Sequence, residues 1–285
     1  MSGIPERQVP AIHHRRVGEV AVTVVSDGVL TGSMAVLQNI TQDESSAMLR
    51  AAFRPVPRQT AINTFLVRAG GRTALIDTGC GPDMQAAVGK LPENLAAAGV
   101  APGEIDLVLL THIHPDHSNG LADAEGRAIF PNAELALHES ELAYWEDAAA
   151  KGVAYADKAR EQIAPYRGRL RLFREGEVFP GLEAVPLPGH TPGHTGYRVS
   201  DGGESALIWG DIVHLPEVQV PRPEVTMQFD VDPAQAAATR RRVFDMVATD
   251  GLLVAGMHLH FPAWAHLARE GGGYRLYPEP WRQAI

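Results

Sequence analysis

The most constraining feature of this sequence is a loop, residues 111–117, in which three histidines and one aspartate lie within six positions. The loop follows the apolar run 105–110, which has the composition of a buried strand. Histidine and aspartate lose hydration when they are buried without partners, so packing alone does not explain this loop. Metal binding does explain it, because imidazole nitrogen and carboxylate oxygen are ligands of zinc, iron, cobalt and manganese. The alternative is a polar surface loop that is rich in histidine by chance.

The spacing within this loop predicts two metal ions. His112 and His114 are two residues apart, so both side chains can converge on one ion. Asp116 and His117 must then point elsewhere, which suggests a second ion. Further candidate ligands follow apolar or Pro-Gly segments later in the chain: His190 in 188–194, Asp211 after 206–208, and His258 after 252–255.

This ordered set, HxHxDH followed by separate His, Asp and His residues at strand ends, resembles the metallo-β-lactamase superfamily. Within that superfamily, the segments 210–214, 225–230 and 256–262 resemble the methyl parathion hydrolase and lactonase branch. The resemblance runs from about residue 17 to about residue 277. It implies an α/β fold, the four-layer αββα sandwich known as the metallo-β-lactamase fold.

The resemblance also implies how the ligands are shared between the ions. The seven ligands divide into two sites with one common carboxylate: His112, His114 and His190 at the first site, Asp116, His117 and His258 at the second, and Asp211 as the bridge.

Two further polar residues are expected beside these ligands. Asp77 would accept a hydrogen bond from a ligand imidazole and so fix its tautomer; the alternative is a turn aspartate that bonds its own backbone. His194 lies four residues after His190, and in the family pattern it supports the surrounding fold.

The predicted mechanism is hydrolysis by a hydroxide shared between two divalent ions about 3.5 to 4 Å apart. Asp116 or His214 would move the proton. Zinc is the first expectation for both ions, and iron, cobalt and manganese are alternatives.

The predicted substrate is a small neutral molecule with an ester-like bond, namely a lactone, an aryl ester or a phosphotriester. The candidate pocket residues are Phe65, Met84, Tyr144, Trp145 and His260. His260 shares a face of extended chain with His258, and its expected place is the pocket rim. Two other functions stay open: a glyoxalase II-like thioester hydrolase, and a non-catalytic metal-binding protein on the same fold.

Charge and composition limit the kinds of partner and the cellular compartment that we expect. The formal net charge of −9 and the pI near 5.7 disfavour a nucleic-acid partner. A single cysteine, Cys80, excludes an intramolecular disulfide and fits a reducing compartment. No apolar run approaches membrane-spanning length, and the N-terminus lacks the charged-then-apolar order of a secretory signal. We therefore expect a cytoplasmic protein without a membrane partner; a mature secreted form and a homodimer stay open.

The chain of 285 residues suits one large α/β domain. We expect an extended arm at 1–16 and a single hydrolase domain at 17–285. The Thr41 and Glu44 pair has capping-box spacing and predicts a helix start. A second helix is predicted over 82–98, with a break at Pro92, and the arginine run 240–242 is predicted to be a solvated helix face.

Overall fold

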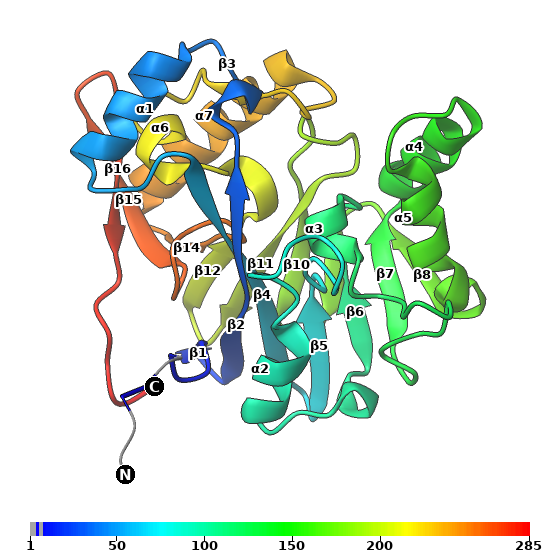
Figure 1. Ribbon diagram of the computed structural model, residues 1–285. Coiled ribbons are helices and arrows are strands. Elements are labelled where there is room, and N and C mark those ends of the chain that lie inside the picture. The colour runs from blue at the N-terminus through cyan, green and yellow to red at the C-terminus, as the bar shows by residue number, and fades with distance from the viewer. Residues whose placement is uncertain (1–3, 6–7) are drawn as a thin grey trace.

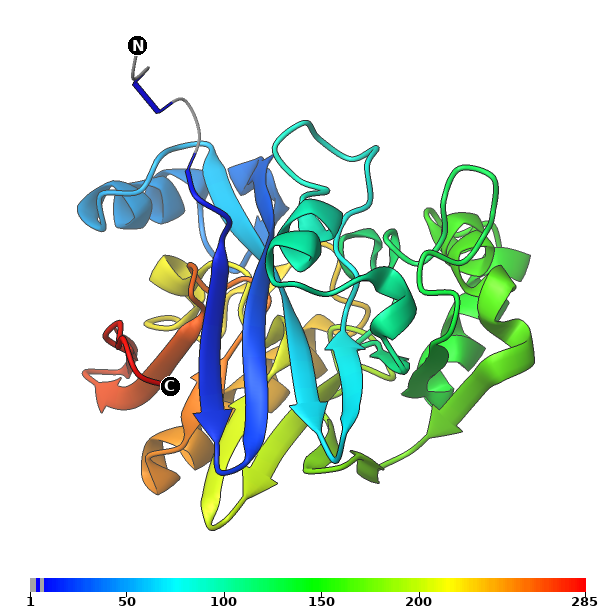
Figure 2. The ribbon, with the colours of Figure 1, turned by 90° about the horizontal axis from the view of Figure 1, so that it is seen from below.

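Two large β-sheets form the centre of the molecule (Figure 1). The computed structural model describes residues 4–5 and 8–285, so positions 1–3 and 6–7 of the expected arm lie outside the described residues. The first sheet has seven strands in the spatial order β1 (Ile12–Val17), β2 (Val20–Gly32), β4 (Arg58–Ala69), β5 (Arg72–Ile76), β6 (Leu107–Leu109), β7 (Glu134–His138) and β8 (Leu170–Phe173). Figure 2 shows the β1–β2 hairpin in blue beside β4 and β5 in cyan.

The second sheet also has seven strands and packs against the first. Its spatial order is β16 (Gly273–Pro278), β15 (Trp264–Glu270), β14 (Leu253–Ala255), β12 (Glu204–Ile208), β11 (Thr195–Asp201), β10 (Leu182–Pro186) and β9 (Gly176–Phe179). A small two-stranded sheet pairs β3 (Leu37–Gln38) with β13 (Thr226–Met227). The pairs β5–β6, β6–β7, β7–β8 and β12–β14 are parallel.

Helices cover the outer faces of both sheets. The α-helices are α1 (Gln42–Ala51), α2 (Leu91–Ala97), α3 (Pro115–Ser118), α4 (Glu139–Ala150), α5 (Ala156–Ile163), α6 (Pro216–Gln219) and α7 (Pro233–Asp250). Short 3-10 turns lie at η1 (Met34–Val36), η2 (Pro102–Glu104), η3 (Ala164–Arg169) and η4 (Gly210–Ile212). Helix α1 begins after Thr41, and Thr41 and Glu44 form the predicted capping box.

The alternation of side chains along β6 shows how the layers are built. Leu107 and Leu109 point into the core between the two sheets, whereas Val108 points to the opposite face. That opposite face is covered by apolar side chains of α2, α4 and α5. Helix α7 packs Val243 and Phe244 against the second sheet. The predicted four-layer αββα sandwich is confirmed.

Three local predictions differ from the structure. Residues 12–16, expected within the extended arm, belong to strand β1 (Ile12–Val17), because the backbone of β1 pairs with β2 along the whole length of β1. The helix predicted over 82–98 is shorter and starts at Leu91, with Pro92 in its first turn. The amides of Gly89 and Leu91 donate to the buried Asp27 carboxylate, so this segment approaches Asp27 as a loop before the helix begins.

The third difference concerns the arginine run on α7. Arg240 is 1% exposed, and its guanidinium donates to the carbonyls of Ile212, Pro223 and Val225. The prediction of a solvated face is therefore wrong for this residue, although Arg241 and Arg242 are exposed. Arg240 instead anchors the chain that follows Asp211.

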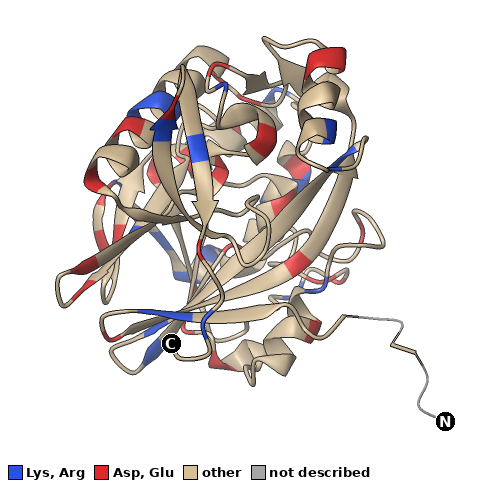
Figure 3. Cartoon of the chain, turned by 90° about the vertical axis from the view of Figure 1, so that its left-hand side faces the viewer, with Lys and Arg blue, Asp and Glu red and all other residues tan. Residues whose placement is uncertain are grey.

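Charged residues of both signs are interspersed along the helices and strands on the side shown in Figure 3. Within residues 4–5 and 8–285, no helix has both the length and the apolar character that a membrane crossing would require.

Candidate metal centre

The candidate ligands, and Asp77 which supports one of them, lie on loops that follow the carboxyl ends of strands in both sheets. Asp77 follows β5, the 111–117 loop follows β6, Asp211 lies in η4 after β12, and His258 follows β14. His190 lies in the connection between β10 and β11. In sheets with parallel strands, ligand sites form beyond the carboxyl ends of the strands. The fold therefore brings together residues that are up to 181 positions apart, from Asp77 to His258.

The first cluster contains three imidazoles. His112 Nε2 lies 3.0 Å from His114 Nδ1 and 3.2 Å from His190 Nε2, and the His114 and His190 atoms are 2.8 Å apart. Three nitrogens bound to one tetrahedral zinc ion at 2.0–2.1 Å would lie about 3.3 Å apart. The three nitrogens thus already have nearly the spacing that one ion requires.

The second cluster combines a carboxylate with two imidazoles. Asp116 Oδ2 lies 3.6 Å from His117 Nε2 and 3.5 Å from His258 Nε2. His117 is turned into this cluster by α3, a single helical turn in which Pro115 occupies the first position. The structure therefore groups Asp116, His117 and His258 as a second set of donors that could hold an ion.

Asp211 lies between the two clusters. Its Oδ2 is 3.2 Å from His117 Nε2 and 3.1 Å from His258 Nε2 in the second cluster. The same atom is 3.6 Å from His112 Nε2 and 3.4 Å from His190 Nε2 in the first. One carboxylate thus contacts both candidate sites.

Hydrogen bonds outside the clusters fix which ring nitrogen faces inward. His117 Nδ1 lies 2.7 Å from Asp77 Oδ2, and His258 Nδ1 lies 2.8 Å from the carbonyl oxygen of Ala61. Asp77 also accepts from the Thr111 hydroxyl, which in turn contacts His112 Nδ1 at 3.0 Å. In each case Nδ1 is engaged and Nε2 is left to face the cluster.

His194 supports the bridging residue. Its Nδ1 lies 2.8 Å from the carbonyl oxygen of Leu187, and its Nε2 accepts from the Asp211 backbone N–H at 2.8 Å. Because an N–H group can only donate, His194 Nε2 carries no proton. His194 is therefore placed to hold Asp211 and not to face either cluster.

Asp230 is a functional candidate that the sequence interpretation missed. Its Oδ1 lies 2.6 Å from His190 Nδ1, and its Oδ2 accepts from the Met227 N–H at 2.8 Å. It plays for His190 the part that Asp77 plays for His117. The only signal in the sequence was its place in segment 225–230, which carried part of the family resemblance.

His214 also reaches the centre. Its Nε2 lies 3.0 Å from Asp211 Oδ2, and its ring stacks on His258 at a centroid distance of 5.2 Å. Neither ring nitrogen of His214 makes a hydrogen bond within the described part of the chain. Gln219 holds its backbone by accepting from the His214 N–H at 2.7 Å. Burial lowers the pKa of His214 to about 4, which makes it a neutral imidazole at pH 7.

The pKa shifts in the clusters show that the buried carboxylates need positive charge beside them. Burial opposes ionisation of Asp211, but the neighbouring His117 and His258 hold the pKa of this carboxyl well below its ordinary value. Burial likewise opposes charge on His117, yet Asp211, Asp116 and Asp77 raise its pKa well above 6.5. Either protons on imidazoles or bound cations can supply the compensating charge, so protons and metal ions compete for the same atoms.

The predicted pocket residues have different locations. Phe65 is completely buried and packs edge-on against Trp264 in the core between the sheets. Met84 is 38% exposed in the loop before α2. Tyr144 packs against Trp145. The rings of Trp145 and His114 are nearly perpendicular, with their centroids 5.5 Å apart.

Phe229 is an aromatic neighbour of the centre that the sequence interpretation did not select as a wall. Its ring lies 5.2 Å from the ring of His214, 5.8 Å from that of His190 and 6.1 Å from that of His114. It is 38% exposed, so it forms an apolar surface that solvent reaches beside the first cluster and His214.

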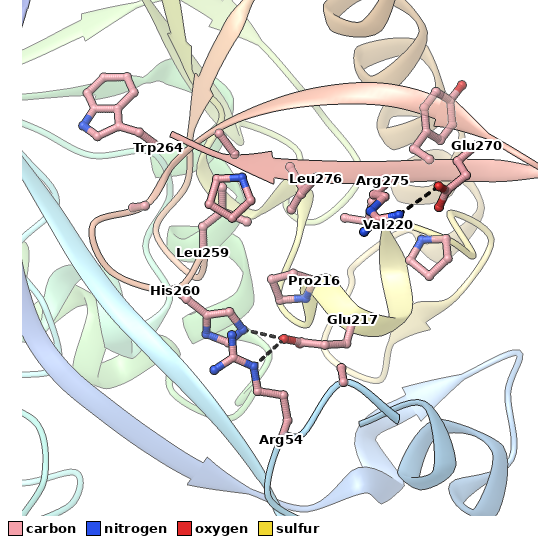
Figure 4. A pocket seen from close by; sticks show the side chains of 16 residues that line it. Arg54, Pro216, Glu217, Val220, Leu259, His260, Trp264, Glu270, Arg275 and Leu276 are labelled. Atoms are coloured by element: carbon pink, nitrogen blue, oxygen red, sulfur yellow. Dashed lines mark hydrogen bonds and ion pairs between the residues drawn. The ribbon is translucent and has the colours of Figure 1, made fainter. Parts of the chain in front are cut away.

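His260 lines a cavity of about 420 Å³ (Figure 4). Its Nε2 pairs with Glu217 Oε1 at 2.5 Å, and Arg54 Nε donates to the same oxygen at 2.9 Å. The lining of this cavity contains none of the seven candidate ligands. His258 and His260 are thus separated by the structure, with only His258 in a metal cluster.

The sequence model of the Metallo-beta-lactamase superfamily matches residues 57–258, well over half of the chain. The chain belongs to this superfamily. All seven candidate ligands lie within the matched segment, with His258 as its last residue. The resemblance seen in the sequence is confirmed, and the solved structures similar to this superfamily member include hydrolases and lactonases.

Solved structures that match almost the whole chain include a hydrolase and a lactonase. The hydrolase AbOPH of the beta lactamase superfamily has a TM-score of 0.90 and 32% identity, with 97% of this chain and 100% of that chain covered. The dizinc quorum-quenching lactonase AidC also has a TM-score of 0.90, with 23% identity, 96% of this chain and 99% of that chain covered. At the lower identity, the likeness to AidC shows the fold alone.

Curated relatives match over shorter segments. The N-acyl homoserine lactonase AiiB of Agrobacterium fabrum (strain C58) is 26% identical over 164 residues, which are 48% of this chain and 57% of the relative. The acyl-coenzyme A thioesterase MBLAC2 of Gallus gallus is 30% identical over 179 residues, which are 53% of this chain and 57% of the relative. The chain thus spans little more than half the length of these two relatives.

Proposed function

We propose that this superfamily member is a binuclear metal-dependent hydrolase that cleaves neutral ester-like bonds, with lactones as the first substrate class. One observation carries the proposal: Asp211 Oδ2 lies within 3.6 Å of imidazole nitrogens from both clusters. Two sets of nitrogen and oxygen donors that share a carboxylate suit a pair of divalent cations.

The donor set fits two ions of the zinc type. Two buried atoms, His117 Nε2 and Asp211 Oδ1, have no hydrogen-bond partner among the described residues. Buried polar atoms are rarely left without a partner, and cations would satisfy both. We assign His112, His114 and His190 to a first ion and Asp116, His117 and His258 to a second, with Asp211 shared. Imidazole and carboxylate ligands favour zinc, with iron, cobalt and manganese as alternatives.

Asp116 and His214 are the residues that would transfer protons beside these ions. Two bound divalent ions would supply a nucleophile from water at neutral pH and polarise the oxygen of the substrate. The Asp116 carboxylate is 20% exposed and borders the second cluster, so it can accept a proton there and return it to a leaving group. His214 is the second candidate for this role, since its ring lies at Asp211 with both nitrogens otherwise unengaged.

Apolar side chains beside the centre support an uncharged substrate. Phe229 is partly exposed beside His114 and His190, and the buried ring of Trp145 packs at a steep angle to His114. Similarity to the lactonase AiiB supports the lactone class. Aryl esters and phosphotriesters, which present the same uncharged ester-like centre, complete the proposed range.

A thioester is the second candidate substrate class, because a region of the chain is 30% identical to an acyl-coenzyme A thioesterase. A screen of the zinc-loaded protein against a lactone, an aryl ester, a thioester and a phosphotriester distinguishes these classes. We expect the highest kcat/KM for the lactone or the aryl ester. A clear preference for the thioester would replace our ranking, and no hydrolysis of any of them would favour a non-catalytic metal-binding protein.

Three further proposals concern the domain organisation, the compartment and the partners of the protein. We propose that residues 17–285 act as one hydrolase domain and that the protein works in the cytoplasm on a small molecule, without nucleic acid or membrane. We also propose that the protein can form a homodimer. Size-exclusion chromatography with light scattering measures its mass in solution and tests this.

A further inference from the structure

Helix α4 contributes a completely buried carboxylate that the proposed mechanism does not use. Glu141 is 0% exposed, and each of its two oxygens accepts two hydrogen bonds. Oε1 accepts from the Ile113 N–H at 2.9 Å and from Trp145 Nε1 at 2.7 Å. Oε2 accepts from the Thr191 hydroxyl at 2.6 Å and from the Gly193 N–H at 3.1 Å.

The donors come from the two loops that form the first metal cluster. Ile113 lies between His112 and His114, whereas Thr191 and Gly193 follow His190. One carboxylate therefore connects both loops to the first turn of α4. The His190 loop lies very close to α4: a Cβ atom at Gly193 would be only 2.4 Å from the Glu141 backbone nitrogen. Glycine at this position allows the His190 loop to contact the helix.

The four hydrogen bonds leave Glu141 suited to holding the loops and not to proton transfer. Burial raises the pKa of Glu141, whereas the four hydrogen bonds oppose that rise. The backbone N–H groups of Ile113 and Gly193 and the indole N–H of Trp145 can only donate. A proton on the carboxyl group would therefore face donors and find no acceptor except the Thr191 hydroxyl. The carboxylate form satisfies all four groups.

We propose that Glu141 is a positioning residue that holds the His190 loop at the correct distance from His112 and His114 for one ion to bind all three. This inference rests on the binuclear centre proposed above. It names a residue that sets the ligand geometry of one of the two metal sites. The second cluster should be much less sensitive to Glu141, because His258 lies on a different segment and the Thr191 and Gly193 bonds hold only the His190 loop. Asp116 and His117 share the 111–117 loop with Ile113, so they are affected only if the bond from the Ile113 N–H is lost.

Glu141→Gln tests this selectivity. An amide has one acceptor oxygen, which must serve Ile113 and Trp145, because both of those groups can only donate. The amide NH₂ then faces the Thr191 hydroxyl, which can rotate and accept, and the Gly193 N–H, which cannot. The substitution should therefore release the His190 loop while the 112–114 loop stays held.

The measurement is a zinc titration of metal-free protein against a chromophoric chelator, repeated with cobalt(II) to follow ligand geometry by visible absorption. For Glu141→Gln, we expect one of the two binding steps to weaken by about 10- to 100-fold, as for other residues that orient metal ligands. The other step should keep its wild-type affinity. His190→Ala identifies the step that belongs to the first cluster, and Glu141→Gln should weaken that same step.

Glu139→Gln is the matched control, since Glu139 lies on the same helix turn, but its side chain is 43% exposed and pairs with Arg174. It should bind both ions like wild type. If Glu141→Gln does not fold, Thr191→Val, which removes only the hydroxyl donor, should weaken the same step by a smaller factor.

Two outcomes would overturn the inference. One is a Glu141→Gln or Thr191→Val protein that loses thermal stability without metal yet binds both zinc ions as tightly as wild type, which would make the residue merely structural. The other is equal weakening of both steps. If wild-type protein itself binds fewer than two ions, the binuclear proposal fails instead, so the two failures are distinguishable.

Discussion

Replacing Asp230 with asparagine tests whether its carboxylate sets the ligand nitrogen of His190. In the native protein, Oδ1 faces His190 Nδ1 and Oδ2 accepts from the Met227 N–H. Asparagine has a single acceptor oxygen. Without metal, the amide oxygen can serve Met227 while the NH₂ group faces an unprotonated His190 Nδ1, which places the imidazole proton on Nε2. That tautomer has no lone pair to offer the first ion.

Zinc binding would then force the amide to turn and leave the buried Met227 N–H without a partner. An unsatisfied buried donor costs about 1–3 kcal/mol, which corresponds to about 5- to 150-fold weaker binding. We expect Asp230→Asn to weaken the first zinc ion within this range in a chelator-competition titration. Asp232→Asn is the control, because Asp232 is an exposed N-cap of α7 and asparagine caps helices equally well. Wild-type affinity for both ions in Asp230→Asn would refute this account of His190.

Three further predictions follow from the same geometry. Asp211→Asn removes a negative charge from between two cations, so it should release one ion and lower kcat by more than about 100-fold, the upper range for losing an outer partner; retention of both ions and near-normal kcat would show that Asp211 is not the bridge. His258→Ala should lose zinc after mild chelation, whereas His260→Ala, which breaks only the Glu217 pair, should keep it; the reverse result would exchange the two roles. The apolar walls predict a higher kcat/KM for a neutral lactone or aryl ester than for an anionic phosphodiester, and a preference for the diester would reverse the substrate ranking.

Much of the fold could be predicted because strong local signals agreed with the tertiary structure. The apolar run before the histidine loop forms β6, whose three residues are all buried. The capping-box pair at Thr41 and Glu44 begins α1 where its spacing indicated. The arrangement in layers came instead from the family resemblance, since residue patterns do not specify which sheets pack together.

The errors occurred where a distant side chain overrides a local pattern. The segment before α2 has helical composition, but Asp27 binds its amides and holds it as a loop. Arg240 lies in a basic run, yet three carbonyl groups satisfy its guanidinium inside the protein.

The site shows the same division between what sequence does and does not reveal. The ligand candidates were recognisable because packing alone rarely calls for so many histidine and aspartate residues at the end of a buried strand. Asp230 contacts the ligand His190, 40 positions away, and Glu141 holds loop residues that are 28 to 52 positions away. Nothing near Asp230 or Glu141 in the sequence marks that role. Phe65 was predicted in the pocket, but the alternation of β4 directs it to the core.

The number of metal ions bound by the active protein tests the central claim most directly. Elemental analysis of purified protein loaded with zinc and freed of excess metal, with lactone hydrolysis followed on the same sample, gives both quantities together. The two clusters joined by Asp211 predict two ions per chain at full activity. A reproducible value of one ion per chain in the fully active protein would contradict the binuclear centre.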